Sequence, residues 1–375
     1  MGYLLLKPYD SLFFRDGKPF EKGTSRWLSG MNIPYPSTIY GAIFSHIIRQ
    51  NPKVSDEVDK MRQEFEKLKG KKQDKLAEAL ESKLMGYLKI KNIYLYDKNR
   101  NAAYIPAPLD IFINEEGRIK YGEFIKEKYR CNNEIELEYL MKNPKDYDRA
   151  DNYYMNILDF VRYYAKGKRR NGLLISENDI FEKSYKVGIE LNETRTSEEG
   201  HLYRIDTSEF IDKGFRFLIE YEIDKDIKLT SGYIRLGGEG KLAELEVIDE
   251  EIYDIKMLNK YYENTNLENN YVKLVLTTES IFKETAFFPK LKNIDVVGIV
   301  NDKPLHIGGY DMLRKRPKPM MKANKRGCIY ILEFKNAKCK SLKDIKEEIE
   351  KAVDFGKGNS YRGFNRFILS IFKGD

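Results

Sequence analysis

The sequence of 375 residues has few of the side chains that build metal centres or disulfide frameworks. It contains three cysteines (Cys131, Cys328 and Cys339) without a CxxC pair, and three isolated histidines. Because three scattered cysteines cannot all pair and do not have zinc-knuckle spacing, they fit a reducing cytoplasm. No HExxH, GxSxG or GxxxxGK[ST] motif occurs. We therefore expect no metal, no cofactor and no catalytic residue of a common kind.

Long apolar runs are also missing. No stretch approaches the roughly 20 apolar residues that a membrane-spanning helix requires. The opening "MGYLLLKPYDSLFF" has an acid within ten residues and lacks a small-residue cleavage site, so we expect a first strand there and not a signal peptide. The chain is 41% hydrophobic and 13% aromatic, which is enough to fill the cores of two or three soluble domains.

The predicted elements repeat in two halves. Each half begins with a strand, has a strand pair in its middle and ends with a glycine-bearing turn before a final strand. In the first half a helix is predicted to begin at Ser37 and to end at Asn51–Pro52. Strand, helix, two strands, helix, strand is the ferredoxin-like split βαβ arrangement, which RNA-recognition domains also use. The second helix of the first half is weak, because "DKDIKLTSG" is barely a turn.

The predicted fold class is therefore α+β, with two ferredoxin-like domains at residues 1–250 and 271–375. The first domain carries helical and irregular insertions over residues 53–183. One part of this insertion has a narrow apolar seam at helical spacing, formed by Val54, Val58, Met61, Phe65 and Leu68. We favour packing of this seam on its own domain over the alternative, a partner-binding surface. From Asp97 to Asn178 the sequence is Tyr-rich, polar and irregular.

Two segments have residues that suit phosphate groups. Glycines let backbone amides approach an anion closely, and one glycine cluster is followed by a lysine: Gly237, Gly238, Gly240 and Lys241. The second segment, Asn301 to Cys328, has eight basic and two acidic residues, a local surplus of +6 within a net charge of +7. Such a surplus can neutralise phosphates. The alternatives are a tight turn for the first segment and a solvated loop for the second.

Two further motifs have a functional and a structural interpretation. The stretch "KGFRFLIEY", Lys213 to Tyr221, matches four of the five positions of the RNA-recognition signature K/R-G-F/Y-G/A-F. Its aromatic residues all lie on one face of the predicted strand, and we favour a core role over base stacking. His46 lies on the predicted first helix and is a candidate general base near a phosphate, although a structural histidine is the preferred interpretation.

Four separated segments together resemble one known family. They are "LLLKPYDSLFFRDGKPF", "IPYPSTIYGAIFSHI", "LGGEG" and "PLHIGGYDMLRKRPKPM". They look like the RAMP-superfamily third subunit of the Cmr complex, the type III-B CRISPR RNA-guided effector. The resemblance spans essentially the whole chain, but it does not extend to residues 53–183. Near the end, "SYRGFNRF" departs from the G-F-G turn of the family, because Asn365 replaces the last glycine.

The resemblance implies a non-catalytic subunit with two ferredoxin-like domains. Its implied partners are the 5′ tag of the CRISPR RNA, the large polymerase-like signalling subunit and the backbone RAMP subunit of the complex. The residues implied to contact RNA lie in the opening loop, the start of the first helix, the glycine loop and the basic loop: Arg15, Lys18, Ser37, Thr38, Gly237, Gly238, Gly240, Lys241, Gly308, Gly309, Arg314, Lys315, Arg316 and Lys318.

Two other functions are compatible with the same residues. One is a metal-independent RAMP-type ribonuclease that processes CRISPR RNA, with His46 as base and the glycine loop as phosphate holder. The other is a protein adaptor whose basic loop binds an acidic partner. The basic loop from Leu305 to Met321 is stiffened by Pro317 and Pro319, which lowers the entropy cost of presenting its charges. With the family resemblance, this favours RNA as the target.

Overall fold

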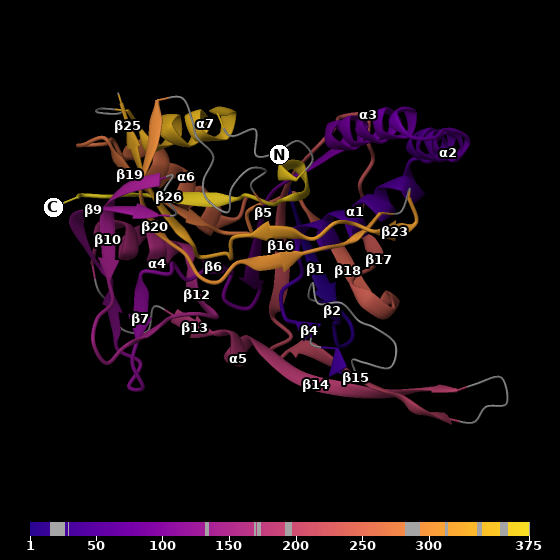
Figure 1. The fold of residues 1–375 in the computed structure, drawn as a ribbon, viewed down its shortest axis with the longest axis horizontal. Helices are drawn as coiled ribbons and strands as arrows, with labels where there is room; N and C mark the ends of the chain where they lie inside the picture. Colours follow the sequence, from indigo (N-terminus) through magenta and orange to yellow (C-terminus); the bar gives the residue numbers. More distant parts are fainter. Residues whose placement is uncertain are drawn as a thin grey trace. The chain divides into compact units, whose positions relative to one another are not determined.

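The computed structural model is a mixed structure of helices and mainly antiparallel sheets (Figure 1). It describes residues 1–15, 27–28, 30–131, 135–168, 170, 174–191, 197–281, 293–311, 314–335, 340–352 and 359–374. No helix among these residues is long and apolar enough to cross a membrane.

The chain forms two compact units, each assembled from three separate segments. Unit 1 consists of Met1–Lys91, Asn178–Asp249 and His306–Met321. Unit 2 consists of Asn92–Glu177, Glu250–Leu305 and Lys322–Asp375. These units differ from the continuous domains expected at residues 1–250 and 271–375. The cause is long-range strand pairing, which no local sequence pattern encodes.

Unit 1 contains a sheet in which β1 is central. β1 (Gly2–Pro8) pairs antiparallel with β16 (Phe215–Ile223) on one side and with β18 (Leu242–Ile248) on the other. Strand β17 (Gly232–Arg235) pairs with β18, and the start of β5 (Leu88–Asp97) lies next to β16. The order is therefore β5, β16, β1, β18, β17. The segment between β16 and β17 forms no helix, as its short polar sequence predicted.

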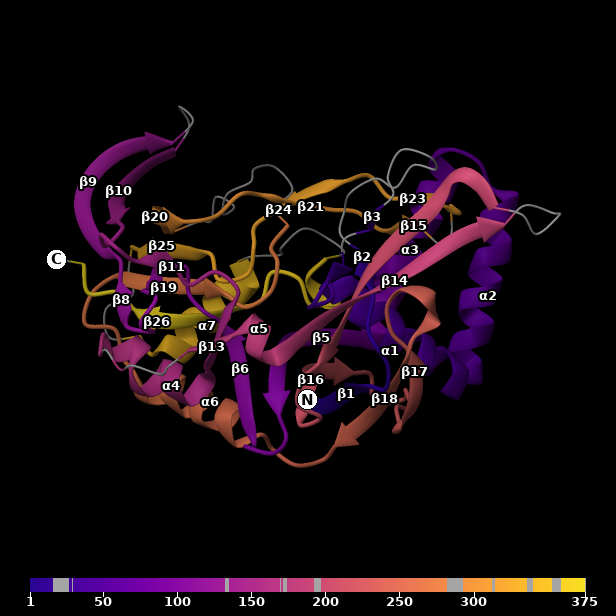
Figure 2. The same cartoon turned by 90° about the horizontal axis from the view of Figure 1, so that it is seen from below.

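The remaining elements of unit 1 are the helices α1 (Pro36–Gln50), α2 (Pro52–Lys67) and α3 (Lys71–Tyr87), the turn η2 (Gly238–Gly240), and the strands β2 (Phe14–Arg15), β3 (Trp27–Leu28), β4 (Gly30–Met31), β14 (Phe181–Leu191), β15 (Ser197–Phe210), β22 (Tyr310–Asp311) and β23 (Arg316–Pro317). Strands β14 and β15 form a long antiparallel hairpin (Figure 2). Three short elements straddle the division between the units: α5 (Glu177–Ile180), β21 (Leu305–Ile307) and β24 (Met321–Ala323).

The core of unit 1 explains two sequence motifs. Leu4 and Leu6 are fully buried and pair with Ile219 and Phe217, so the strand aromatics of the "KGFRFLIEY" motif lie in the core. Base stacking on Phe217 is thereby excluded, and the core interpretation is confirmed. Helix α1 begins and ends as predicted, with a proline in its first turn that fits the helix start.

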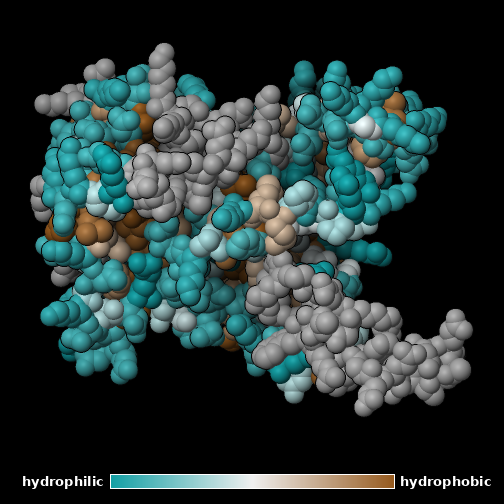
Figure 3. Space-filling view, in the orientation of Figure 1, coloured by the Kyte–Doolittle hydropathy of each residue, from teal (hydrophilic) through white to brown (hydrophobic). Residues whose placement is uncertain are grey.

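The apolar seam of the insertion also packs on its own unit. Val54, Val58 and Phe65 are all buried, α2 contacts α1 and α3, and the amide of Gln73 on α3 donates to the carbonyl of Phe65 on α2 at 3.2 Å. In Figure 3 the face of this helical hairpin is mainly hydrophilic. The packing interpretation is therefore confirmed for Val54, Val58 and Phe65, whereas Met61 and Leu68 are half-buried.

Unit 2 is built around a sheet in which β19 (Tyr271–Leu276) and β25 (Ile329–Phe334) are central. Its order is β26, β19, β25, β20, β10, β9. The β10–β20 pair is parallel, and it joins the insertion to the end of the chain in one sheet. The other bounds are β6 (Ala102–Pro106), β7 (Ile111–Ile113), β8 (Ile119–Tyr121), β9 (Glu123–Cys131), β10 (Ile135–Lys142), β11 (Asp148–Arg149), β12 (Tyr153–Asn156), α4 (Ile157–Arg162), η1 (Tyr164–Lys166), β13 (Leu174–Ser176), α6 (Tyr253–Asn264), β20 (Ile294–Val300), α7 (Leu342–Ala352), η3 (Ser360–Arg362) and β26 (Phe367–Ile371).

Two features of unit 2 were not predicted. The Tyr-rich segment expected to be irregular contains the strands β6 to β13. Helix α6 was not expected, although Ile255, Leu258 and Tyr262 occur at helical spacing and are buried. Both errors come from short or strongly polar segments whose structure depends on their neighbours.

Candidate nucleic-acid interface

The structure brings the opening segment and the glycine loop together in unit 1. The backbone N–H of Gly238 donates to the carbonyl of Phe13 at 2.9 Å. Gly237 has φ +81° and ψ −164°, and a Cβ atom there would lie 2.7 Å from the carbonyl oxygen of Phe13 and 2.9 Å from the ring of Phe14. Only glycine fits this conformation and this close approach. The two motifs, more than 200 residues apart, therefore form one site.

An ion pair holds the end of the glycine loop. The Nζ atom of Lys241 donates to Oδ2 of Asp10 at 2.9 Å, and the Lys241 side chain is 9% exposed while that of Asp10 is 60% exposed. The hydrogen bond from Lys241 lowers the pKa of the Asp10 carboxyl group. Lys241, which the family resemblance implies as an RNA contact, is paired with Asp10 here, and this pair shapes the end of the glycine loop.

Two exposed cations remain near this loop. Lys186 on β14 lies beside Lys241, and that neighbouring cation lowers the pKa of Lys186. Arg15 is exposed at the end of β2, directly after the segment that contacts the glycine loop. Glu239 is an exposed acid within the loop, where it adopts a positive φ of 56°. A phosphate group would reduce the repulsion between the two lysines, which is an arrangement suited to anion binding.

The basic loop makes contacts with other elements of unit 1. Arg314 donates to Asp74 on α3 at 2.7 Å and to Asp311 at 2.9 Å, and Lys315 donates to Glu66 on α2 at 3.0 Å. In this structure the guanidinium of Arg314, one of the residues implied to contact RNA, is held by two carboxylates. The cause is the helical insertion, whose acidic residues the sequence did not place near this loop.

The other predicted residues have different environments. Arg316 is exposed on β23, and the backbone N–H of Lys318 donates to the carbonyl of Gly309 at 2.8 Å, which closes the β22–β23 hairpin. Gly308 lies close to Met320, whose sulfur would be 2.7 Å from a Cβ at this position. Two further residues, Ser37 and Thr38, are half-buried in the first turn of α1, and Lys18 lies outside the described residues.

His46 has a structural environment. It is buried, and its Nε2 atom lies 2.9 Å from the carbonyl oxygen of Thr230, a geometry in which Nε2–H donates. The Arg49 guanidinium then donates to Nδ1 at 3.1 Å. Both ring nitrogens are therefore engaged inside the fold, and this geometry agrees with the preferred structural interpretation.

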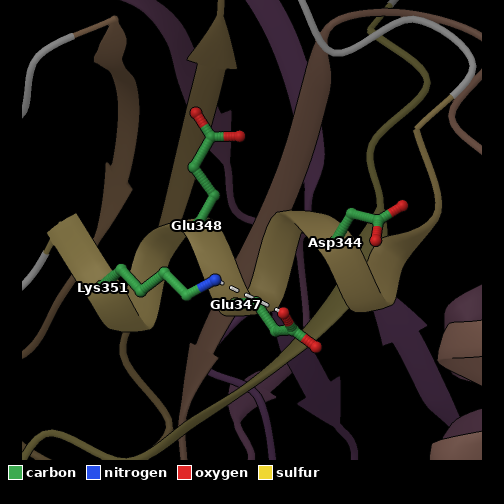
Figure 4. A pocket seen from close by; sticks show the side chains of 4 residues that line it. All are labelled: Asp344, Glu347, Glu348 and Lys351. Atoms are coloured by element: carbon green, nitrogen blue, oxygen red, sulfur yellow. Dashed lines mark ion pairs between the residues drawn. The ribbon is translucent and has the colours of Figure 1, made fainter.

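A cavity lies on one face of α7 in unit 2 (Figure 4). Asp344, Glu347, Glu348 and Lys351 line it, and Lys351 pairs with Glu347 at 3.6 Å. Three carboxylates against one ammonium repel phosphate groups, so this cavity is no part of an RNA site. No cluster of potential metal ligands occurs among the described residues.

The sequence analysis missed three residues that shape these sites: Asp10, Lys186 and Asp74. Asp10 had a signal, since it lies in the phrase "KPYDSLFF" that belongs to the family resemblance. Lys186 and Asp74 had none, because they reach the loops from β14 and α3 only through tertiary packing.

Comparisons with known proteins agree with the sequence resemblance. A family model described as "CRISPR-associated protein (Cas_Cmr3)" matches residues 4–365. Two solved structures of type III-B Cmr-beta bound to cognate target RNA, one of them also with AMPPnP, contain a similar chain. Their TM-scores are 0.52 and 0.50, each at 18% identity, and the alignments cover 97% of this chain and 96% and 95% of the matched chains.

A third structure, a Csm3–Csm4 subcomplex of a type III-A complex, is more distant, with a TM-score of 0.38 at 15% identity over 90% of this chain and 94% of the other. No curated protein matches the sequence. Because the family model covers nearly the whole length, the chain belongs to the CRISPR-associated Cmr3 family, the RAMP-superfamily third subunit of the Cmr complex.

Proposed function

We propose that this chain is a non-catalytic RNA-binding subunit of a type III-B CRISPR effector and holds the 5′ tag of the CRISPR RNA. Its neighbours in the complex are the large polymerase-like signalling subunit and the backbone RAMP subunit. The observation that carries the proposal is the joint site of the opening segment and the glycine loop. There, Gly237 and Gly238 lie against Phe13 while Arg15 and Lys186 stay exposed.

This site has the features that phosphate recognition requires. A glycine loop without Cβ atoms lets a sugar–phosphate backbone approach its amides, and cations at its edge neutralise phosphate charge. Because the Asp10–Lys241 pair holds the loop, little conformational entropy is lost when the RNA binds. The solved Cmr-beta structures were obtained with target RNA, which supports RNA and other Cmr subunits as partners.

The strand orders support a ferredoxin-like arrangement for both units. The sheet order in unit 1 is β5, β16, β1, β18. If these four strands are numbered along the chain, the order across the sheet is second, third, first, fourth. The sheet order in unit 2 is β26, β19, β25, β20. Numbered in the same way, this is fourth, first, third, second, which is the unit 1 order counted from the opposite edge of the sheet. This is the order of the split βαβ arrangement, with α7 as the second crossover helix of unit 2. In unit 1 a hairpin and the glycine loop take the place of that helix.

RNA binding measured against salt concentration tests the proposal. We expect the full chain to bind a single-stranded tag RNA, and Arg15→Ala and Lys186→Ala each to make the slope of log affinity against log salt shallower by about 0.7. Lys128→Ala is the matched control, because Lys128 is exposed on β9 in unit 2. Wild-type affinity and slope in the Arg15/Lys186 double variant would refute this site.

The non-catalytic part of the proposal has its own test. Repeat RNA is incubated with the purified chain in EDTA, and we expect no defined cleavage product. The burial of His46 and its bond to Thr230 support this expectation. A defined product that disappears in a folded His46→Gln variant would instead establish the ribonuclease alternative.

A further inference from the structure

The basic loop is attached to the helical hairpin of α2 and α3 at two points. Arg314 binds Asp74 near the start of α3, and Lys315 binds Glu66 near the end of α2. Glu66 and Asp74 flank the turn between the two helices. Figures 1 and 2 both draw β23 beside this hairpin. A segment more than 220 residues later in the chain is therefore held by the tip of the helical insertion.

Arg314 has a more enclosed environment than a solvated arginine. Its side chain is 25% exposed, and its guanidinium lies 5.6 Å from the ring centroid of Phe65, which is buried. The hydrogen bonds that the guanidinium donates to Asp74 and Asp311 raise its pKa above the ordinary value. A planar guanidinium that binds two carboxylates and lies over a ring has its orientation fixed by several contacts at once.

The same contacts orient the rest of the loop. Asp311, which accepts from Arg314, faces Arg316 across the β22–β23 pair, and Lys318 is bonded through its backbone N–H to Gly309. When Arg314 is fixed, the short hairpin that presents the exposed Arg316 is fixed with it. Lys315 contributes less to this attachment, because its pair with Glu66 is exposed on both sides.

We propose that the α2–α3 hairpin positions the basic loop for RNA, with Arg314 as a positioning residue and Arg316 and Lys318 as the phosphate-facing residues. This inference rests on the proposed RNA-binding function. It gives the helical insertion a role: Asp74 and Glu66 at its tip hold Arg314 and Lys315, so that the exposed Arg316 is presented on the short hairpin. The opposite possibility is that Asp74 and Glu66 compete with RNA phosphates for Arg314 and Lys315.

These two possibilities predict RNA affinities of opposite sign. If Arg314 positions the loop, Asp74→Asn releases the loop and weakens tag-RNA binding several-fold. If Asp74 competes with RNA, the same change frees Arg314, strengthens binding and steepens the salt slope. Removing any acid raises RNA affinity through general electrostatics, so Asp59→Asn on the exposed side of α2 is the matched control. Binding by Asp74→Asn that is equal to or tighter than that of Asp59→Asn overturns the proposal.

The salt slope separates positioning from direct contact. Arg316→Ala removes one phosphate contact and should make the slope shallower by about 0.7, whereas Arg314→Ala should cost up to about 1.4 because both phosphate-facing residues lose their placement. In the Asp74→Asn background, Arg314→Ala should have little additional effect. A slope change of only about 0.7 for Arg314→Ala, additive with that of Arg316→Ala, would make Arg314 an ordinary phosphate ligand.

A thermal double-mutant cycle tests the attachment without RNA. We expect Arg314→Ala and Asp74→Ala each to lower the melting temperature, and the double variant to melt no lower than the worse single variant. The Lys315/Glu66 pair is the comparison, where additive and small effects are expected. Additive effects for Arg314 and Asp74 overturn the attachment. If the wild-type chain does not bind tag RNA, the proposed function and the positioning role both fail, while this cycle still decides the attachment.

Discussion

Units 1 and 2 each contain a cation held between a carboxylate and aromatic rings, and the two clusters differ in their access to water. In unit 2, Lys273 lies 2.6 Å from Asp110, with ring centroids of Phe124 at 4.9 Å and Tyr164 at 5.1 Å. Its side chain is 13% exposed and that of Asp110 only 2%. In unit 1, Arg314 is 25% exposed and its partner Asp74 is 63% exposed.

This difference in exposure decides what each cluster does. A buried carboxylate must be compensated completely, and Asp110 accepts hydrogen bonds from Lys273 and from the hydroxyl of Tyr164 at 2.9 Å. Burial raises the pKa of the Tyr164 hydroxyl well above its ordinary value, so it remains a donor. The Arg314–Asp74 pair is more exposed and contributes less to stability than the buried pair, because water screens it. Its effect is on loop geometry, whereas the Lys273 cluster stabilises a core.

The largest effect is expected from breaking the buried pair. Asp110→Ala leaves Lys273 charged and uncompensated, and should lower the free energy of unfolding by about 3–5 kcal/mol. Urea denaturation followed by circular dichroism measures this change. Asp302→Ala is the control, because Asp302 pairs with Lys325 in unit 2 but is much more exposed, and its loss should cost about 1 kcal/mol at most. Equal losses in the two variants would contradict the role assigned to burial.

An intermediate effect is expected at the glycine loop, which is held by backbone contacts and by charge. Gly237→Ala places a Cβ 2.7 Å from the carbonyl oxygen of Phe13 at a backbone conformation reserved for glycine. It should cost about 1–3 kcal/mol of stability and weaken tag-RNA binding. Gly240→Ala is the matched control: its φ is also positive, but the nearest atom is 3.7 Å from the added Cβ. The stability loss should be smaller there, and a Gly237→Ala variant as stable as Gly240→Ala would contradict the close-approach argument.

The smallest effect concerns the Asp10–Lys241 pair, which is half exposed like the Arg314 cluster. Lys241 lowers the pKa of Asp10, so the pair stabilises the folded state above the ordinary carboxyl pKa, and this contribution is lost as the pH falls through the lowered value. The difference in free energy of unfolding between wild type and Asp10→Asn should be at most about 1 kcal/mol near pH 7, because Asp10 is 60% exposed.

That difference should shrink as the pH drops below the ordinary carboxyl value of about 4. Thermal unfolding of both proteins between neutral and acidic pH provides the measurement. A difference that grows toward acidic pH would have the wrong sign for a lowered pKa. It would show that the Asp10–Lys241 pair does not stabilise the loop.

Periodic apolar segments were predicted well because their pattern alone determines which face is buried. Strand β1 lies in the opening segment predicted as a first strand, α1 lies within one residue of its predicted start and end, and β16 contains most of the predicted "KGFRFLIEY" strand. Hydrophobic burial depends only on having apolar residues at the correct spacing, so one sequence suffices. The fold class and the family resemblance follow from these elements and from the specific phrases around them.

The failures occurred where structure depends on distant partners. The sequence of β9 and β10 is polar and predicted an irregular segment. These strands form because they extend a sheet made by residues from later in the chain. The same holds for the site: the glycine and basic residues were identified, but the charge partner of each basic residue was not. Arg314 and Lys241 looked like phosphate ligands and are ion-paired, while Lys186 gave no signal.

The apolar cores, the main elements and the family could therefore be predicted from the sequence, together with the residue types suited to RNA contact. Only the tertiary structure decided the partner of each charge: Asp10 for Lys241, Asp74 for Arg314 and Asp110 for Lys273. The physical reason is one of range. Burial of an apolar face is encoded by neighbours a few residues apart, whereas the strength and partner of an ion pair depend on the distance and water access that chain folding creates across more than 150 residues.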